Sequence, residues 1–242
     1  MASVKTLAGL LASAALTAAT ASNATCDTST LDNSTYYYNI TVQDTTAAQV
    51  ANITGRGICD IARWNLMVDV TIPANVGERF WIPAQDCEPD NTSCFLQEAD
   101  NPQAECLLGG PRLYYTVNGD TYDKIALRLG MNVSAITSTS NGSPTGATGG
   151  VTNGSQVLEA GQFVKIPQCS PSVCQLQPYS FGSEGPGVYK DLAEKYATTV
   201  GQMMMLSATY NYSGNALQGG TPPPISIPIN CTLLSSNYTV LQ

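Results

Sequence analysis

The sequence predicts an α+β protein built from three small modules, each made of a strand, two short helices and a second strand. Three observations predict it. The apolar spacing of a short helix pair occurs three times along the chain, and each pair is followed by a strand that runs through Ile-Pro to a cysteine. Eight cysteines accompany these repeats in a chain of 242 residues, and modules with thin cores often depend on such cross-links.

The first module opens with the strand "YNITV" from Tyr38 and closes with "FWIPAQDC". Between them, "TAAQVANIT" has a Val-Ala pair at the spacing of one helix face, and a second helix is expected after Gly57. The residues "QDTT" leave the start of the first helix open between Thr45 and Thr46. Proline after the closing strand is typical of a strand end at a sheet edge, because proline cannot donate to a ladder.

The second module contains "YYTVNGDTYDKIALRLG", a strand that stops at Gly119 and turns directly into a helix. Glycine tolerates a positive φ angle, so the chain can turn at once, and Asp120 or Thr121 can cap the helix that follows. The helix is expected to end at Gly130, and the next to begin after Asn132. The closing strand is "FVKIPQC".

The third module is the most divergent. It is expected to open with the strand "YSF" from Tyr179. The turn between this strand and the first helix, the strand–helix corner, reads "GPGV" and has neither aspartate nor threonine. A second helix after Thr199 carries the run "MMML", whose methionines are expected to fill the core. The loop "LQGGTPPP" precedes the closing strand "ISIPINC", so the surface formed by corner and loop is expected to be altered or lost.

The first 21 residues read as a secretory signal peptide. They contain one lysine, an apolar run and a small-residue cleavage site, so the mature chain is expected to begin near Ser22. No later apolar run is long enough to cross a bilayer. The sequence therefore predicts a secreted, extracellular protein.

The even number of cysteines in a secreted chain predicts disulfides, with the pairing left open by the sequence. The cysteines are Cys26, Cys59, Cys87, Cys94, Cys106, Cys169, Cys174 and Cys231. They crowd the junctions between the modules and are expected to fasten the modules to one another. A zinc site at Cys87, Cys94 and Cys106 is the alternative, but the spacing is poor and no histidine can complete it.

Charge and composition exclude several classes of function. A formal charge of −8 and a pI near 4.3 disfavour nucleic acid and anionic membranes as partners. The absence of histidine excludes serine triads, cysteine–histidine dyads and imidazole-bound metals, and no cofactor is predicted. Acceptor sequences for N-glycosylation occur at Asn23, Asn33, Asn39, Asn52, Asn91, Asn132, Asn141, Asn153, Asn211, Asn230 and Asn237.

The pattern "YTVNGDTYDKIALRLGMNVSAI … VLEAGQFVKIP" resembles a LysM module, and three such modules behind a signal peptide resemble the secreted fungal LysM effectors. The resemblance implies modules at 36–87, 113–169 and 177–231, with a cysteine-containing linker at 88–112. It implies that each module is a two-stranded antiparallel sheet with two helices on one side. It also implies binding of chitin oligosaccharides, which are hidden from host receptors or chitinases.

In LysM modules the ligand groove lies between the strand–helix corner and the loop before the last strand. The resemblance assigns the corner to Asp44, Thr45 and Thr46 in module 1, to Gly119, Asp120, Thr121 and Tyr122 in module 2, and to Gly187 and Val188 in module 3. It assigns the loop to Thr71, Ile72, Pro73 and Ala74, to Gln156, Val157 and Leu158, and to Gln218, Gly219 and Gly220. An acetamido group matches the backbone donors and acceptors of such a corner.

Two other functions are possible from the sequence. A glycoside hydrolase needs paired carboxylates, for which the candidates are Asp120 with Asp123 and Glu184 with Asp191. A structural wall glycoprotein would also be acidic and rich in glycosylation sequences. No catalytic residue is assigned, and the two tryptophans, at positions 64 and 81, are expected in the core.

The resemblance also bears on how weak grooves act together. The first and third grooves are expected to face each other and bury one sugar chain. One alternative is that the altered third groove leaves only the first and second modules active, each by itself. The other is one oligomer that bridges two protein molecules, which would produce a ligand-dependent oligomer.

Overall fold

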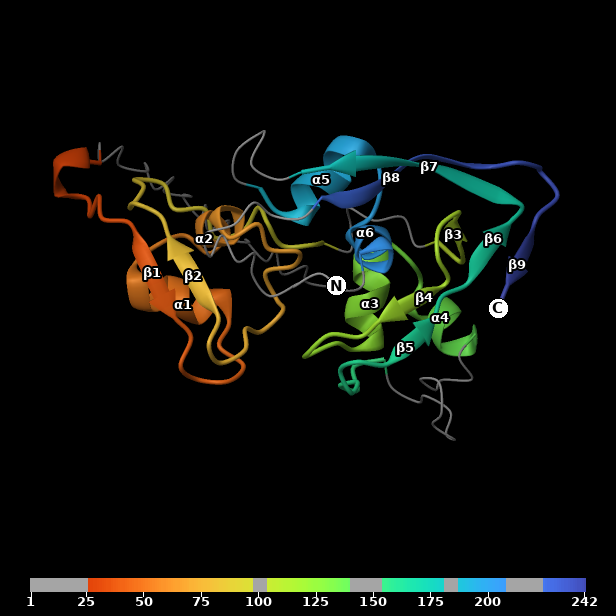
Figure 1. The fold of residues 1–242 in the computed structure, drawn as a ribbon, viewed down its shortest axis with the longest axis horizontal. Coiled ribbons are helices and arrows are strands. Elements are labelled where there is room, and N and C mark those ends of the chain that lie inside the picture. The colour runs from red at the N-terminus through yellow and green to blue at the C-terminus, as the bar shows by residue number, and fades with distance from the viewer. Residues whose placement is uncertain (1–25, 98–103, 140–153, 181–186, 208–223) are drawn as a thin grey trace, which may run out of the picture.

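The computed structural model of this chain describes residues 26–97, 104–139, 154–180, 187–207 and 224–242. The expected signal peptide, residues 1–21, lies outside the described residues. Within these ranges the chain forms three units with the same order of elements, which are strand, helix, helix and strand (Figure 1). We number them unit 1 to unit 3 along the chain.

Unit 1 consists of β1 (Tyr36–Asn39), α1 (Ala47–Thr54), α2 (Ile58–Trp64) and β2 (Arg79–Ile82). The two strands pair antiparallel, and Phe80 and Ile82 point into the core. Helix α1 begins after Thr46, whose side chain accepts a hydrogen bond from the Gln49 N–H while the Gln49 side chain accepts one from the Thr46 N–H. This capping box identifies Thr46, and not Thr45, as the N-cap of the helix, a choice that the sequence left open.

Unit 2 consists of β4 (Leu113–Tyr115), α3 (Tyr122–Leu129), α4 (Val133–Thr139) and β5 (Phe163–Lys165), with β4 antiparallel to β5. Gly119 has a φ of 77°, so the chain turns there as the sequence predicted. The Thr121 side chain caps α3 by accepting from the Lys124 N–H at 3.2 Å. Gly130, with a φ of 62°, ends the helix.

Unit 3 consists of β7 (Ser172–Tyr179), α5 (Tyr189–Tyr196), α6 (Val200–Leu206) and β8 (Ile225–Leu233). Its first strand ends at Tyr179 instead of beginning there, so the expected boundary at 177 falls inside β7. The closing strand also continues past Pro228, which lies opposite Leu176 in the ladder. A two-stranded sheet has two edges, and proline is tolerated on the outer side of an edge strand.

A fourth, three-stranded sheet was not predicted from the sequence. It contains β3 (Leu107–Leu108) from the linker, β6 (Gln168–Ser170) and β9 (Thr239–Leu241) near the C-terminus, in the order β3-β6-β9. Figure 1 shows it at the far side of the molecule from unit 1. A short 3₁₀ helix at Thr28–Thr30 precedes unit 1. In the described part of the chain, no helix has the length and apolarity needed to cross a bilayer.

All eight cysteines form disulfides, and each bridge stays within one unit and its flanking segment. The bridges are Cys26–Cys87, Cys59–Cys94, Cys106–Cys169 and Cys174–Cys231. The prediction that disulfides fasten the modules to one another is therefore wrong. Cys87, Cys94 and Cys106 are each bonded to another cysteine, so they offer no thiolates for zinc.

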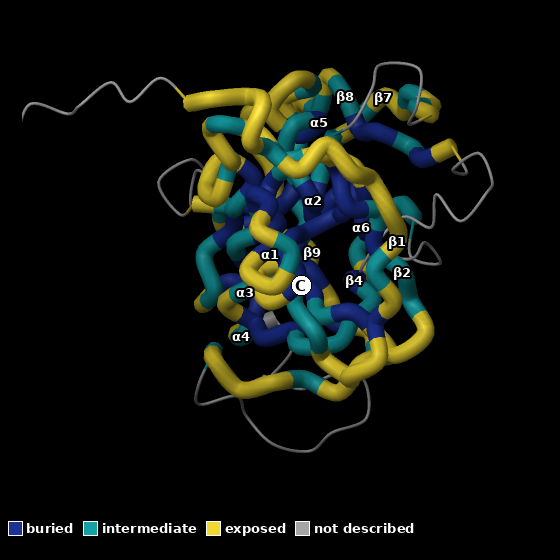
Figure 2. The backbone as a smooth tube through the Cα atoms, turned by 90° about the vertical axis from the view of Figure 1, so that its left-hand side faces the viewer, coloured by how far each residue is buried: buried dark blue, intermediate teal, exposed yellow. Residues whose placement is uncertain are grey.

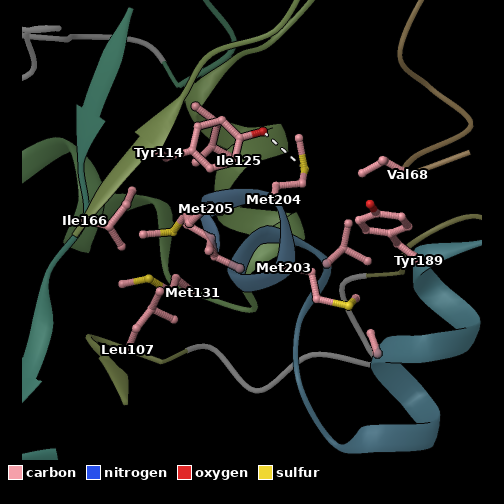
Figure 3. Close-up of a cluster of buried hydrophobic side chains, with 14 of the residues drawn as sticks. Val68, Leu107, Tyr114, Ile125, Met131, Ile166, Tyr189, Met203, Met204 and Met205 are labelled. Carbon is pink, nitrogen blue, oxygen red and sulfur yellow. Dashed lines mark hydrogen bonds between the residues drawn. The ribbon is translucent and has the colours of Figure 1, made fainter. Parts of the chain in front are cut away.

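Packing, and not disulfides, joins the units. One core cluster fills unit 1, whereas a larger cluster combines unit 2, unit 3 and the segment that follows α2. Met203, Met204 and Met205 of α6 are all buried in the larger cluster, where Tyr114 donates a hydrogen bond to the Met204 sulfur at 3.6 Å (Figure 3). The methionines fill the core, as predicted. Figure 2 shows the buried backbone gathered in the interior of the molecule.

The contact between helix α3 of unit 2 and helix α6 of unit 3 depends on Gly201 in α6. A methyl group there would lie 2.6 Å from Leu129 Cγ and 3.1 Å from the backbone carbonyl carbon of Arg128. Both atoms belong to α3, so the two helices approach as closely as they do because this residue has no side chain.

Replacing Gly201 with alanine is expected to lower the free energy of unfolding by ~1–3 kcal/mol, since the methyl group overpacks a filled core. Urea denaturation measures the change. Gly187→Ala is the matched control, because the nearest neighbouring atom of its added methyl group, Asp191 Oδ2, lies 3.8 Å away. Equal stabilities of the two variants would contradict the close packing of α6 on α3.

Candidate functional site

In unit 1 the strand–helix corner and the closing loop are held together through the backbone. The Ala74 N–H donates to the Thr45 carbonyl oxygen at 2.8 Å. The Gln43 side chain adds a second link, because its Nε2 donates to Asn75 Oδ1 at 3.2 Å. Asp44 occupies the left-handed region with a φ of 63°, a conformation that aspartate tolerates better than most residues.

Unit 2 repeats this arrangement with different side chains. The Leu158 N–H donates to the Asp120 carbonyl oxygen at 2.8 Å, and Thr121 forms a bridge pair with Val157. Gly119 takes the left-handed position that Asp44 takes in unit 1. The structure thus brings each predicted corner together with its predicted loop in these two units.

Many of the predicted site residues contribute backbone but no accessible side chain. Asp44, Gln156 and Val157 are exposed, whereas Thr45, Thr46, Thr71, Pro73 and Leu158 are half-buried. The side chains of Ile72, Ala74, Asp120, Thr121, Tyr122 and Val188 are buried. A ligand at these corners therefore meets main-chain groups and a few side chains at the rim.

Asp120 belongs to a buried charge cluster and not to an open groove. Its Oδ1 pairs with Arg128 Nη1, and its Oδ2 accepts from the Val117 N–H at 2.8 Å. Arg128 Nη1 also donates to the Tyr114 hydroxyl at 2.7 Å, and Arg128 Nε pairs with Asp69 Oδ2 of unit 1 at 2.6 Å. A fully buried, paired carboxylate cannot reach a sugar, so the suggested hydrolase pair of Asp120 with Asp123 is wrong.

The electrostatics of this cluster favour the charged forms of Asp69 and Arg128. Burial alone raises the pKa of Asp69, but the attraction of Arg128 and hydrogen bonds from Thr71 outweigh it and hold the pKa below its ordinary value. Burial also opposes the charge of Arg128, yet Tyr114, Asp69 and Asp120 raise its pKa well above the usual value. Burial raises the pKa of the Tyr114 hydroxyl, which stays protonated.

The corner of unit 3 is covered by unit 1. The Gly187 N–H donates to the Arg63 carbonyl oxygen at 3.1 Å, and the Tyr189 N–H donates to the Met67 carbonyl oxygen at 3.2 Å. The Val188 side chain is only 2% exposed and belongs to the core cluster of unit 1. The expected open groove between the first and third modules is therefore absent at the described corner.

Of the remaining candidates of unit 3, Asp191 lies within the described residues. Asp191 accepts from Arg63 Nε at 3.0 Å, so it forms an ion pair with unit 1. Glu184, the other half of the second suggested hydrolase pair, lies outside the described residues. So do Gln218, Gly219 and Gly220 of the expected loop.

The corners of units 1 and 2 lie next to each other. Asn118 Nδ2 donates to Asp44 Oδ1 at 2.6 Å, which links the two corners directly. A methyl group on Gly119 would lie 3.3 Å from Pro73 Cδ, so the closing loop of unit 1 is in contact with the corner of unit 2. Sequence reasoning missed Asn118, although it stands three residues before its helix cap, as Gln43 does in unit 1.

A cavity of about 310 Å³ lies beside the corner of unit 1. It is lined by Tyr38, Thr41, Val42, Gln43, Asp44, Thr45, Gln49, Asn52 and Ile53. Val42 and Ile53 are 67% and 64% exposed, so the cavity offers apolar surface beside side-chain amides. A second cavity of about 590 Å³ lies between the linker, α3 and unit 3, away from the predicted corners.

A family model for the LysM domain matches residues 114–146, which begin at β4 and include the corner of unit 2. The secreted LysM effector LysM13 of Penicillium expansum is 43% identical over 235 residues, a match that covers 96% of this chain and 95% of the relative. This chain belongs to the secreted LysM effectors. Like those relatives, it is a secreted protein.

More distant LysM effectors also match. The secreted LysM effector ECP6 of Passalora fulva is 26% identical over 71% of this chain and 70% of its own length. The secreted LysM effector ELP2 of Colletotrichum higginsianum is 32% identical over 51% of this chain and 62% of its own length. The prediction of a LysM effector made from the sequence is confirmed at the level of the family.

Replacing Asp69 with asparagine is expected to lower the free energy of unfolding by ~3–5 kcal/mol at pH 7, because it leaves the buried Arg128 without one of its two carboxylates. Asp123→Asn is the control. Its carboxylate accepts a 2.7 Å bond from exposed Ser155, so its loss is expected to cost under about 1 kcal/mol.

The effect of Asp69→Asn has a defined pH dependence. The folded pKa of Asp69 lies below the unfolded value of about 3.9, so its contribution is fully present above that pH and is lost as the pH falls through the folded value. The difference between wild type and variant is thus expected to shrink in acid. Urea titrations at pH 7 and near pH 3 measure it, and a difference that grows in acid would contradict the assignment.

Proposed function

We propose that this LysM effector binds oligomers of N-acetylglucosamine, the sugar of chitin, and that its three units are LysM modules. The proposed modules span 36–87, 113–169 and 177–231, the last preceded by the first residues of β7. The observation that carries the proposal is the shared geometry of units 1 and 2. In both units, a backbone hydrogen bond of 2.8 Å joins the residue before the helix N-cap to the closing loop.

The chemistry of the unit 1 corner suits a neutral acetylated sugar. An acetamido group supplies one donor, one acceptor and a methyl group. The cavity of about 310 Å³ offers amides from Gln43, Gln49 and Asn52 beside the aliphatic surface of Val42 and Ile53, and its volume is at the lower end of ligand pockets. Because a neutral hydrogen bond contributes only ~0.5–1.5 kcal/mol, each corner is expected to bind weakly by itself.

The contact between the two corners supports a combined site for longer oligomers. Asp44 and Asn118 are hydrogen-bonded, so a chain bound at one corner presents its next sugars near the other. A second corner at high effective concentration can raise affinity by ~10²–10⁴ without a new type of contact. Unit 3 contributes no corner to this site, because unit 1 covers Val188.

Binding without hydrolysis is the function that the carboxylates support. Asp120 is buried against Arg128, and Asp191 is paired with Arg63. Binding would keep chitin fragments from host receptors or shield a wall from chitinases, and the described corners serve either role. A structural wall glycoprotein, the second candidate, would show no preference among soluble oligosaccharides.

Isothermal titration with chitohexaose and cellohexaose tests the function. Heat is expected from the acetylated oligomer alone, because the acetamido group carries the recognition. Raising the salt concentration is expected to change affinity little, since the ligand is uncharged and no ion is released. Equal heats with both oligomers, or release of shorter sugars during the titration, would contradict the proposal.

Substitutions at the two exposed rims test whether the corners act together. Val42→Trp fills the unit 1 cavity and Val157→Trp obstructs the unit 2 corner, while Leu176→Trp on β7 is the control at a similarly exposed aliphatic residue. If one oligomer spans both corners, either change is expected to weaken hexamer binding by ~10²-fold with one ligand per protein. The control is expected to bind like wild type.

Two other outcomes would contradict a combined site. Loss of one of two equal sites, with unchanged affinity at the other, would mean that the corners work separately. Light scattering that doubles in mass with ligand would mean that one oligomer bridges two protein molecules.

A further inference from the structure

The outer face of the unit 1 sheet carries an aromatic cluster in which Tyr37 is exposed and Trp81 is half-buried. Side chains alternate along a strand, so Tyr37 and Asn39 of β1 share this face with Arg79 and Trp81 of β2. The Tyr37 and Trp81 rings meet edge to face with centroids 4.9 Å apart, and the Arg79 guanidinium lies 4.9 Å from the Tyr37 ring centre. Tyr37 remains 40% exposed, so part of its ring is accessible to a neighbouring group.

The fourth member of this face is the acceptor of a glycosylation sequence. Asn39, Ile40 and Thr41 form the pattern Asn-x-Thr. Ile40 is only 2% exposed and is held by backbone bonds to Glu78 and Gly77, so it keeps its two neighbours turned outward. Asn39 and Thr41 are both exposed, and the acceptor amide therefore stands free of the fold on the side of the aromatic cluster.

Asn39 differs from every other such sequence in the chain. Of the eleven acceptor asparagines in the sequence, Asn39 alone has an aromatic residue two positions earlier, and the two residues lie on the same side of a strand. The residues two positions before the others are Ala21, Leu31, Val50, Pro89, Gly130, Thr139, Val151, Thr209, Pro228 and Ser235. Neighbours at i and i+2 on a strand lie close enough for a group attached to one to cover the other.

We propose that Asn39 carries an N-linked glycan and that the first N-acetylglucosamine of this glycan packs on the Tyr37 ring. The partner is covalent and belongs to the chain itself. One face of a pyranose ring is made of C–H groups, which suit the electron-rich face of an aromatic ring. The sugar would also remove from water the part of the Tyr37 ring that Arg79 and Trp81 leave exposed.

The modification is a transfer from a polyprenyl diphosphate oligosaccharide during secretion. A bond forms between Asn39 Nδ2 and C1 of the first sugar while the bond from C1 to the diphosphate breaks. Nδ2 loses one proton, and the polyprenyl diphosphate leaves with the electron pair. The asparagine Oδ1 is unchanged and remains a hydrogen-bond acceptor, to which the Arg79 guanidinium on the opposite strand is the nearest cation in the ladder.

Arg79 and Trp81 extend the platform beyond one ring. Arg79 stands opposite Asn39, and Trp81 stands opposite Tyr37, so the four side chains form a square on the sheet. A sugar attached to Asn39 and lying on Tyr37 has the donor groups of Arg79 at the edge of its ring. The geometry thus provides both apolar and polar contacts for an N-acetylated ring.

The first test is occupancy. The protein is secreted from a eukaryotic host that performs N-glycosylation. The mass of the peptide containing Asn39 is measured by mass spectrometry before and after enzymatic release of glycans in water labelled with the oxygen-18 isotope. Conversion of Asn39 to labelled aspartate is expected. An unmodified asparagine in the secreted, folded protein would overturn the proposal.

The second test separates a packed sugar from a merely attached one. Glycans are trimmed to one N-acetylglucosamine, and melting temperatures are measured for wild type, Thr41→Ala, Tyr37→Ser and the double variant. Thr41→Ala removes the acceptor sequence but keeps Asn39 and Tyr37. It is expected to lower the melting temperature by ~2–4 °C in the wild-type background, and by under about 1 °C in the Tyr37→Ser background.

Two controls make this test specific. Thr35→Ala removes the sequence at Asn33, which has Leu31 instead of an aromatic residue two positions earlier; because Thr35 is exposed and lies outside helices and strands, the variant is expected to leave the melting temperature unchanged. In protein exported to a bacterial periplasm, where no N-glycan is added and Asn39 stays an asparagine, wild type and Thr41→Ala are expected to melt together. Equal losses from Thr41→Ala with and without Tyr37, or an equal difference between wild type and Thr41→Ala in the protein without glycan, would overturn the packing of the sugar on Tyr37.

Discussion

The structure depends on the burial of one guanidinium group. Arg128 is contacted by Asp69 from unit 1 and by Asp120 and Tyr114 from unit 2, so its charge is satisfied only when the two units are docked. Because each disulfide is confined to one unit, this cluster takes the place of a covalent link between units. A buried cation that loses its partners is costly, which makes the docked arrangement much more favourable than a partly separated one.

The same cluster fixes the geometry of the corner in unit 2. The Asp120 side chain is held by Arg128 and by the Val117 N–H, while its carbonyl oxygen binds the closing loop through Leu158. One residue thereby couples the interior charges to the surface that is proposed to bind the ligand. Buried interactions beneath a binding surface hold its residues in place before a ligand binds, and this reduces the conformational entropy lost on binding.

Local patterns predicted local structure well. Helix ends at Gly57, Gly130 and Thr199 lie where glycine and threonine chemistry indicated, and the methionines of α6 fill the core. Properties that depend on distant partners could not be read in the same way. Asp120 had the pattern of a cap residue, but its burial depends on an arginine and a second unit. Trp64, expected in the core, is 43% exposed, because the apolar periodicity of a seven-residue helix does not define which side a neighbouring unit will cover.

The order of the cysteines has a consequence for synthesis of the chain. The first four cysteines pair among themselves, the next two pair with each other, and the last two follow. As the polypeptide enters an oxidising compartment from its N-terminus, each set of partners is complete before the next set emerges. The two disulfides of unit 1 can therefore form before Arg128, the ion-pair partner of Asp69, has entered the compartment. Correct disulfide pairing does not require the whole protein to be present.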